Sequence, residues 1–281
     1  MLQFEKPVYK ITDSVESNFY GKFELEPLER GFGNTIGNAL RRVMLSSLPG
    51  SAISSIKIDG VLHEFQTIDG VYEDVATIIL NLKGVVIKNH TNGPKTLHLN
   101  ATEEGEVTAG DIESDPDVEI INKDKVIATL SKGGKLNMEI VVTNGRGYVD
   151  SEINKKLLDI KKPGVIAIDS SYSPIERVSY EVEPARVGQD ETYDKLVLEV
   201  WTNGSMKPEE AIALASRILI EHFELLTDLS SIADVSGMMI EKTEDPKTKA
   251  LETSIEDLDF SVRAYNCLKR AGIHTLQDLV N

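Results

Sequence analysis

The pattern of apolar and polar positions first predicts a helix over residues 34–48. Four apolar side chains recur there at spacings of three and four residues and so share one face: Ile36, Leu40, Val43 and Met44. Asn34 or Thr35 is a suitable N-terminal cap, and the Pro49-Gly50 pair ends the helix. The face that carries these four residues is expected to pack on a core.

The opposite face of this helix is unusual for a solvent-exposed surface. It combines Leu45 with Arg41, Arg42 and the amides of Asn34 and Asn38. A solvated face with one stray leucine is an ordinary explanation, because much of any protein surface is apolar. Arginines beside an apolar anchor are also typical of protein interfaces. Periodicity alone leaves both interpretations open.

A β-dominated block follows. Alternation and turn dipeptides predict strands at 20–26 before the helix and, after it, at 53–58, 61–65, 85–87, 97–99, 118–120, 126–127, 136–142, 165–168, 177–182 and 195–201. One amphipathic helix interrupts the block over 71–83, and Gly84 follows it. The polar, lysine-bearing segment 150–163 is expected to form a loop.

The longest predicted helix begins at Pro208, with two acidic residues near its positive end. One apolar seam along it contains Ala211, Ala215, Ile218, His222, Leu225 and Leu229, and a second stripe contains Ile212, Leu219, Phe223 and Leu226. A helix that is apolar over so much of its girth needs burial on two sides. It is either fully buried within the chain or, as we favour, packed against its symmetry mate in a dimer.

Residues 231–253 lose this periodicity and read as a linker. Helical spacing resumes over 254–281, which is expected to be the beginning of a small all-α domain. About 30 residues rarely form a stable core alone, so this domain is expected to be incomplete.

Composition narrows the functional classes. The 281 residues include 30 basic and 46 acidic side chains, a formal net charge of −16. Extensive nucleic-acid binding is disfavoured, because neutralising phosphates requires clustered lysine and arginine. The single cysteine, Cys267, excludes an intrachain disulfide. Without a long uninterrupted apolar stretch, the chain is expected to be cytoplasmic, with no membrane partner.

Candidate catalytic and cofactor motifs are weak. The glycines at 31, 33 and 37 do not match the spacing of a dinucleotide-binding loop. The five histidines are scattered, and the nearest approach to a two-metal aspartate cluster is Asp111, Asp115 and Asp117 in a turn-rich segment. We therefore expect no catalytic residues, no metal and no cofactor in this chain.

Five segments carry a family resemblance: ERGFGNTIGNALRRVMLSSLPG at 29–50, DGVLHEFQTIDGVYEDVATIILNLKG at 59–84, NGRGYV at 144–149, YSPIERV at 172–178 and TNGSMKPEEA at 202–211. In this order they closely resemble the signature segments of the bacterial RNA polymerase alpha-subunit family. The resemblance implies an α+β fold, with a dimerisation subdomain formed by 1–50 and 170–230. A β-rich subdomain, 51–169, would be inserted into it.

The resemblance also implies roles for particular residues. Arg42 and Leu45 match family positions that contact the β subunit, while Lys83 and Ile168 match positions that hold the β′ subunit. Arg263, Asn266 and Cys267 match positions that contact promoter DNA, within a domain that also meets activators. Combined with periodicity, it places Ile36, Leu40, Ile218, His222, Leu225 and Leu229 at the homodimer interface.

Simpler interpretations of two of these residues stay open. Lys83 could act only as a cation at a helix C-terminus, and Arg263 only as an exposed helix charge. Two other function classes also remain: a nucleotide-binding enzyme built on the glycine-rich segment, and an autonomous DNA-binding regulator. The first conflicts with the glycine spacing and the second with the net charge.

Overall fold

The computed structural model describes residues 4–5, 8–15, 19–158, 163–187, 190–227 and 239–240. The chain divides into two compact units. Met1–Pro7 and Ile232–Asn281 form the smaller unit, where β1 (Phe4–Glu5) pairs in parallel with β16 (Met239–Ile240). Val8–Ser231 forms the larger unit, which contains all other described elements.

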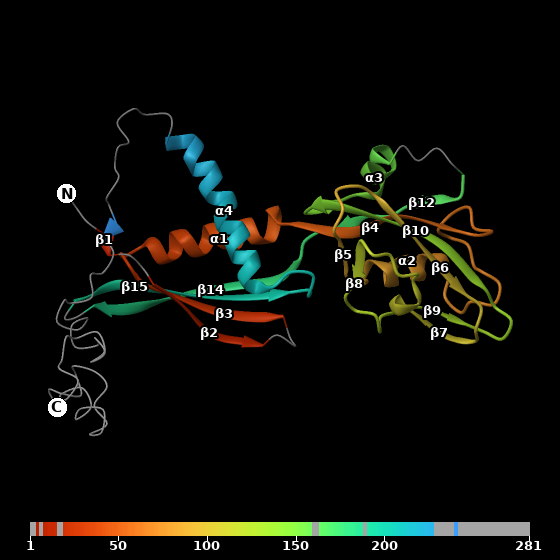
Figure 1. Ribbon diagram of the computed structural model, residues 1–281, viewed down its shortest axis with the longest axis horizontal. Helices are drawn as coiled ribbons and strands as arrows, with labels where there is room; N and C mark the ends of the chain where they lie inside the picture. Colours follow the sequence, from red (N-terminus) through yellow and green to blue (C-terminus); the bar gives the residue numbers. More distant parts are fainter. Residues whose placement is uncertain are drawn as a thin grey trace, which may run out of the picture. The chain divides into compact units, whose positions relative to one another are not determined.

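One part of the larger unit is built on a four-stranded antiparallel sheet in the order β14-β15-β3-β2. Its strands are β2 (Val8–Val15), β3 (Tyr20–Leu28), β14 (Ile175–Val187) and β15 (Asp190–Thr202). Helices α1 (Phe32–Ser47) and α4 (Pro208–Thr227) lie over one face of this sheet (Figure 1). Their buried residues and those of the sheet form one hydrophobic cluster, which includes Leu40, Met44, Leu48, Val178, Leu198, Val200, Ala211 and Ala215.

Two glycines let helix α1 approach the sheet closely. A Cβ atom on Gly37 would lie 2.6 Å from Cδ2 of Tyr180, and one on Gly33 would lie 2.8 Å from Cγ1 of Val182. Both distances are shorter than any relaxed carbon–carbon contact. Two of the three glycines considered for a dinucleotide-binding loop therefore make room for the helix against its own sheet.

The beginning of helix α1 differs from the prediction. Neither Asn34 nor Thr35 caps it. Its N-terminal cap is Gly31, which adopts the left-handed conformation at φ 92°. No side chain provides a capping hydrogen bond at this end of the helix. The Gly31 N–H instead donates to Oδ2 of Asp194 at 2.8 Å. The sequence pattern missed this arrangement because the acceptor comes from strand β15.

The remaining part of this unit contains a six-stranded sheet in the order β6-β10-β4-β5-β8, with β12 also paired to β4. The strands are β4 (Pro49–Ile58), β5 (Ile87–Asn89), β6 (Lys95–Ala101), β8 (Val118–Ile120), β10 (Leu136–Arg146) and β12 (Val165–Ala167). Two small sheets pair β7 (Gly105–Thr108) with β9 (Val126–Leu130) and β11 (Tyr148–Val149) with β13 (Ser170–Ser171). Helices α2 (Val75–Lys83) and α3 (Ser151–Leu157) and the 3₁₀ turn η2 (Ala109–Asp111) complete it.

A second hydrophobic cluster fills this β-rich part. Its most deeply buried members, each at most 1% exposed, are Ile56, Val75, Ile78, Leu82, Ile87, Leu99, Ala109, Ile127, Ala128, Leu130, Leu136, Ile140 and Val142. The α+β fold class that the resemblance implies is confirmed.

Three element predictions in the β-rich part were wrong. The helix predicted from residue 71 begins at Val75, because Asp74 caps it by accepting from the Thr77 N–H at 2.8 Å. Residues 61–65 form no strand, and Phe65 is 81% exposed there. The segment expected to be a loop contains helix α3, which Asp150 caps.

We predict that Gly37→Ala lowers the free energy of unfolding by about 1–3 kcal/mol, because the added methyl group must displace the ring of Tyr180. Helix propensity alone would give the opposite sign, a gain of about 1 kcal/mol. Urea unfolding followed by circular dichroism measures the difference. The matched control is Asn38→Ala at the neighbouring exposed position, which should change stability little. A stabilised Gly37→Ala protein would contradict the close approach.

Candidate functional site

The outward face of helix α1 presents one arginine and one leucine. Arg41 is engaged within the chain, since its Nε donates to the Val178 carbonyl at 3.3 Å. Arg42 is exposed, and Leu45 is 38% exposed. Within the described ranges the Arg42 guanidinium has no hydrogen bond or ion pair. Periodicity placed the two arginines on one face of the helix, but the structure distinguishes them. Arg41 is hydrogen-bonded to strand β14, and Arg42 has no side-chain partner among the described residues.

An apolar groove lies between helices α1 and α4 and their sheet. Its volume is about 450 Å³, and its lining includes Phe23, Leu25, Ile36, Leu40, Leu198, Ile212, Leu219, Ile220 and Phe223. Two predicted interface residues, Ile36 and Leu40, contribute to it, although Leu40 is only 7% exposed. Ile220 was in neither predicted stripe. Sequence periodicity could not identify Ile220, because only the position of the sheet shows which side of helix α4 borders the groove.

The second half of helix α4 is exposed on several sides. Ile220, Phe223, Leu225 and Leu226 are 54–70% exposed. The side chain of His222 is satisfied within its own helix, with Nδ1 2.7 Å from the Ile218 carbonyl oxygen. Ile218 itself packs partly buried against the cluster under α1 and α4. Leu229, the last predicted interface residue, lies outside the described residues.

Lys83 ends helix α2 beside a carboxylate that sequence reasoning missed. Its Nζ lies 2.5 Å from Oδ1 of Asp169, and the Tyr148 hydroxyl donates to Oδ2 of the same carboxylate at 3.0 Å. These three residues come from a helix end, strand β11 and the segment between β12 and β13. Lys83 is thus more than a cation at a helix C-terminus.

The hydrogen bonds at Asp169 decide its protonation. Burial raises the pKa of this carboxyl, but the hydrogen bonds from Lys83 and Tyr148 outweigh burial and bring the pKa below its ordinary value of 3.8. Hydrogen bonding to Asp169, followed by burial, raises the pKa of the Tyr148 phenol above its ordinary value of 10.0. At neutral pH the site therefore holds an ionised carboxylate and a neutral phenol.

Ile168 lies next to this carboxylate but points inward. Its side chain is 3% exposed and belongs to the hydrophobic cluster of the β-rich part. Its backbone N–H donates to the Ser54 carbonyl, and its carbonyl accepts from the Asn154 amide at 2.7 Å. Any part of Ile168 in a subunit contact is therefore indirect, through the position of Asp169.

Three of the segments that carry the family resemblance meet at one joint. Gly50 of β4 and Gly145 of β10 are cross-strand partners, and both make room for Tyr172. A Cβ on Gly50 would lie 1.9 Å from the Tyr172 carbonyl oxygen, and one on Gly145 would lie 2.7 Å from its ring. The Tyr172 hydroxyl also lies 2.8 Å from Oγ1 of Thr143.

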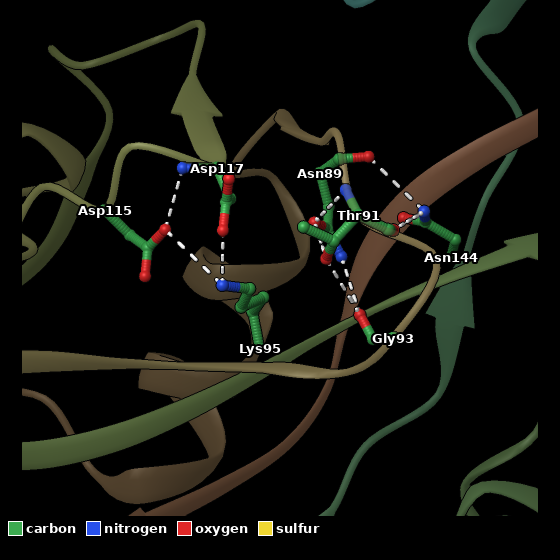
Figure 2. A network of polar contacts seen from close by, with 7 residues as sticks. All are labelled: Asn89, Thr91, Gly93, Lys95, Asp115, Asp117 and Asn144. Carbon is green, nitrogen blue, oxygen red and sulfur yellow. Dashed lines mark hydrogen bonds and ion pairs between the residues drawn. The ribbon is translucent and has the colours of Figure 1, made fainter.

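A polar network next to this joint holds the loop after β5. The Asn144 amide donates to the Thr91 carbonyl at 2.7 Å and to the Asn89 carbonyl at 3.3 Å, while its oxygen accepts from the Ser51 hydroxyl at 2.8 Å. Asn89 closes the loop by donating to the Gly93 carbonyl (Figure 2). Asn144, the first residue of the NGRGYV segment, therefore has a structural role: it holds the loop after β5 against β4 and β10.

The three aspartates considered as metal ligands have structural partners. Asp117 pairs with Nζ of Lys95 at 2.5 Å, and Asp115 lies 4.0 Å from the same nitrogen (Figure 2). Asp111 accepts from the Thr108 backbone in a capping box. Across the described ranges, no group of three or more His, Cys, Asp or Glu side chains is arranged to hold a metal ion.

Arg263, Asn266 and Cys267, the predicted DNA contacts, lie outside the described residues, as does the linker except for β16. Among the helices that the structure describes, none is both long and apolar enough to cross a membrane.

We predict that Asp169→Asn lowers the free energy of unfolding near neutral pH by about 1 kcal/mol. Because the pKa of Asp169 is lowered in the fold, the ionised carboxylate stabilises the protein above pH 3.8, and this contribution is lost as the pH falls through the folded-state pKa. Urea titrations should show the difference from wild type shrinking below pH 3.8. Asp69→Asn, at an exposed turn position, is the control and should show no such pH dependence.

Comparisons with known proteins identify the family. The model described as "RNA polymerase Rpb3/RpoA insert domain" matches residues 56–173, and the model of the C-terminal domain of the bacterial RNA polymerase alpha subunit matches 241–281. The DNA-directed RNA polymerase subunit alpha of Clostridium perfringens strain 13 is 57% identical over 279 residues, covering 99% of this chain and 88% of the relative. Those of Desulforamulus reducens and Symbiobacterium thermophilum are each 56% identical, cover 100% of this chain, and are themselves covered to 88% and 89%. The chain belongs to the family of bacterial DNA-directed RNA polymerase alpha subunits.

Proposed function

We propose that this chain is the assembly subunit of a DNA-directed RNA polymerase in the bacterial cytoplasm. It homodimerises, serves as the platform for the β and β′ subunits, and contacts promoter DNA and activators through its C-terminal segment. The observation that carries the proposal is the geometry of helix α1. One side packs on its own sheet and borders an apolar groove, while Arg42 and Leu45 face outward on the other.

The proposed domain organisation follows the two hydrophobic clusters. One draws on residues between Leu40 and Leu48 and between Ile175 and Ala215, which supports a dimerisation subdomain formed by 1–50 and 170–230. The other draws on residues from Ile53 to Ile168, which supports an inserted subdomain at 51–169. The linker at 231–253 and the helical segment at 254–281 complete the proposal, and the C-terminal family match supports the latter.

Dimerisation would cover the exposed apolar residues of helix α4. Each Å² of apolar surface removed from water contributes about 25 cal/mol, so leaving Phe223, Leu225 and Leu226 exposed is unfavourable. A two-fold axis near the groove would place α4 of each copy against α1 of the other, a self-complementary arrangement. Ile36, Leu40, Ile218, His222, Leu225 and Leu229 would then belong to one interface, together with Ile220.

Separate surfaces would bind the two large subunits. Arg42 would make planar contacts to β, with Leu45 as the apolar anchor beside it. Lys83, held by Asp169, would contact β′, and Ile168 would support that contact from the core. Arg263, Asn266 and Cys267 would reach promoter DNA, where a narrow minor groove attracts arginine.

The role in RNA synthesis would be organisational. We infer that this chain supplies no catalytic residue, and that the metal ions of nucleotidyl transfer are held by other subunits of the complex. The competing enzyme hypothesis loses two glycines of its main motif, since Gly33 and Gly37 lie against the side chains of the sheet.

We predict that Ile220→Asp combined with Phe223→Asp converts the dimer to monomers, because two carboxylates in the groove would have to be desolvated. Light scattering measures the mass. Ala213→Asp adds a charge at an exposed position of the same helix outside the groove, so this control should stay dimeric. A double variant that remains dimeric would place the interface elsewhere.

A second prediction separates the surfaces. Arg42→Ala should stay dimeric but weaken retention of β by about tenfold or more, as expected for loss of an interface arginine. Co-purification with β, together with light scattering, tests both properties. Arg217→Ala, which removes an exposed arginine from helix α4, is the matched control and should retain β. If Arg42→Ala holds β as tightly as wild type, the outward face of α1 is not the β contact.

A further inference from the structure

A polar cavity of about 340 Å³ lies beside the Lys83–Asp169 ion pair. It is bordered by the end of helix α2, by Tyr148, and by the chain from Asp169 to Glu176. Neither the sequence motifs nor the family resemblance assigns a ligand to it. Its chemistry is set by the charged groups that reach it.

These charges do not balance. Lys83 and Asp169 neutralise each other, which leaves the carboxylate of Glu176. Glu176 is exposed at the beginning of β14, and no hydrogen bond or ion pair to it occurs in the part of the chain that the structure describes. The adjacent Arg177 is directed elsewhere, with its guanidinium carbon 4.7 Å from the centroid of the Trp201 ring.

The backbone adds to this negative potential. Helix α2 ends at the cavity, and its C-terminal cap, Gly84, is part of the lining. The carbonyl end of a helix carries a partial negative charge. A cation in the cavity would therefore interact with both the Glu176 carboxylate and the helix end.

The neutral polar groups of the lining offer less to a ligand. The Ser51 hydroxyl donates to Asn144, that of Ser170 to the Ile53 carbonyl, and that of Ser173 to the Ile175 carbonyl. Apolar parts of Val85 and Ile175 border the same space. This combination suits an aliphatic stem with a positive head better than a neutral sugar or amide.

We propose that the cavity receives one basic side chain, lysine or arginine, from the β′ subunit. This inference rests on the proposed function, in which the surface around Lys83 holds β′. Glu176 then selects a positively charged side chain. The Lys83–Asp169 ion pair forms part of the edge of the cavity. The net charge of −16 favours a basic partner segment in the same way.

The first test compares Glu176→Gln with Glu181→Gln, an exposed glutamate on the same strand. A complex of the α dimer with β is titrated with β′ at low and high salt. Glu176→Gln should weaken β′ binding about tenfold at low salt, with a smaller effect at high salt, because one charge-assisted hydrogen bond is lost. Glu181→Gln should bind as wild type. Equal binding by the two variants overturns the proposal.

Lys83→Ala separates this inference from the proposed function. If Lys83→Ala weakens β′ binding but Glu176→Gln does not, the surface holds β′ without a buried basic side chain. If neither variant changes binding, the β′ contact lies elsewhere and the proposed function fails at this surface. Circular dichroism and the dimer mass should be those of wild type for both variants.

A second measurement identifies the occupant. The photoreactive residue p-benzoyl-phenylalanine is placed at Ser171, an exposed position in the cavity lining. Irradiation of the assembled complex followed by mass spectrometry should give a cross-linked β′ peptide with a lysine or arginine at or next to the site of attachment. Cross-linking to β, to an apolar or acidic β′ peptide, or to no subunit would overturn the proposal.

Discussion

The close approach of helix α1 to its sheet is the constraint on which the rest of the larger unit depends. Without side chains at Gly33 and Gly37, the helix lies directly on Tyr180 and Val182. That contact fixes the rotation of the helix about its axis, so it decides that Leu40 and Met44 are buried while Arg42 and Leu45 face outward. One packing contact thus determines both the core and the exposed surface.

A second close contact connects the helix layer to the β-rich part. Helix α1 is followed almost at once by β4, whose Gly50 lies against the Tyr172 backbone. Gly145 accepts the ring of the same tyrosine. Close packing leaves room for shifts of only about a few tenths of an ångström between these atoms. The contact therefore fixes the path of the chain between the two hydrophobic clusters. Packing therefore explains Gly50, Gly145 and Tyr172 of the family segments.

The polar surfaces follow from these contacts. Asp169 meets Lys83 because β12 and β13 carry it past the end of helix α2, and the same path borders the cavity in which Glu176 has no partner among the described residues. The chain therefore presents an outward arginine, an apolar groove and an acidic cavity on one scaffold. Under the proposed function these distinct surfaces would serve different partners, because each partner is recognised by different chemistry.

The sequence by itself determined the positions of α1 and α4, most strands, and the outward position of Arg42, because periodicity and turn residues act locally. The fold class came from the resemblance of its segments to a known family. Only the tertiary structure decided the Gly31 cap, the partner of Lys83 and the burial of Ile168. The helix within 150–163 had a local signal, the Asp150 cap, which the prediction of a loop overlooked. Asp194 and Asp169 are far from their partners in the sequence, and no local pattern encodes such distant contacts. Ile168 ends a run of four apolar residues, and only packing shows that its side chain points into the core.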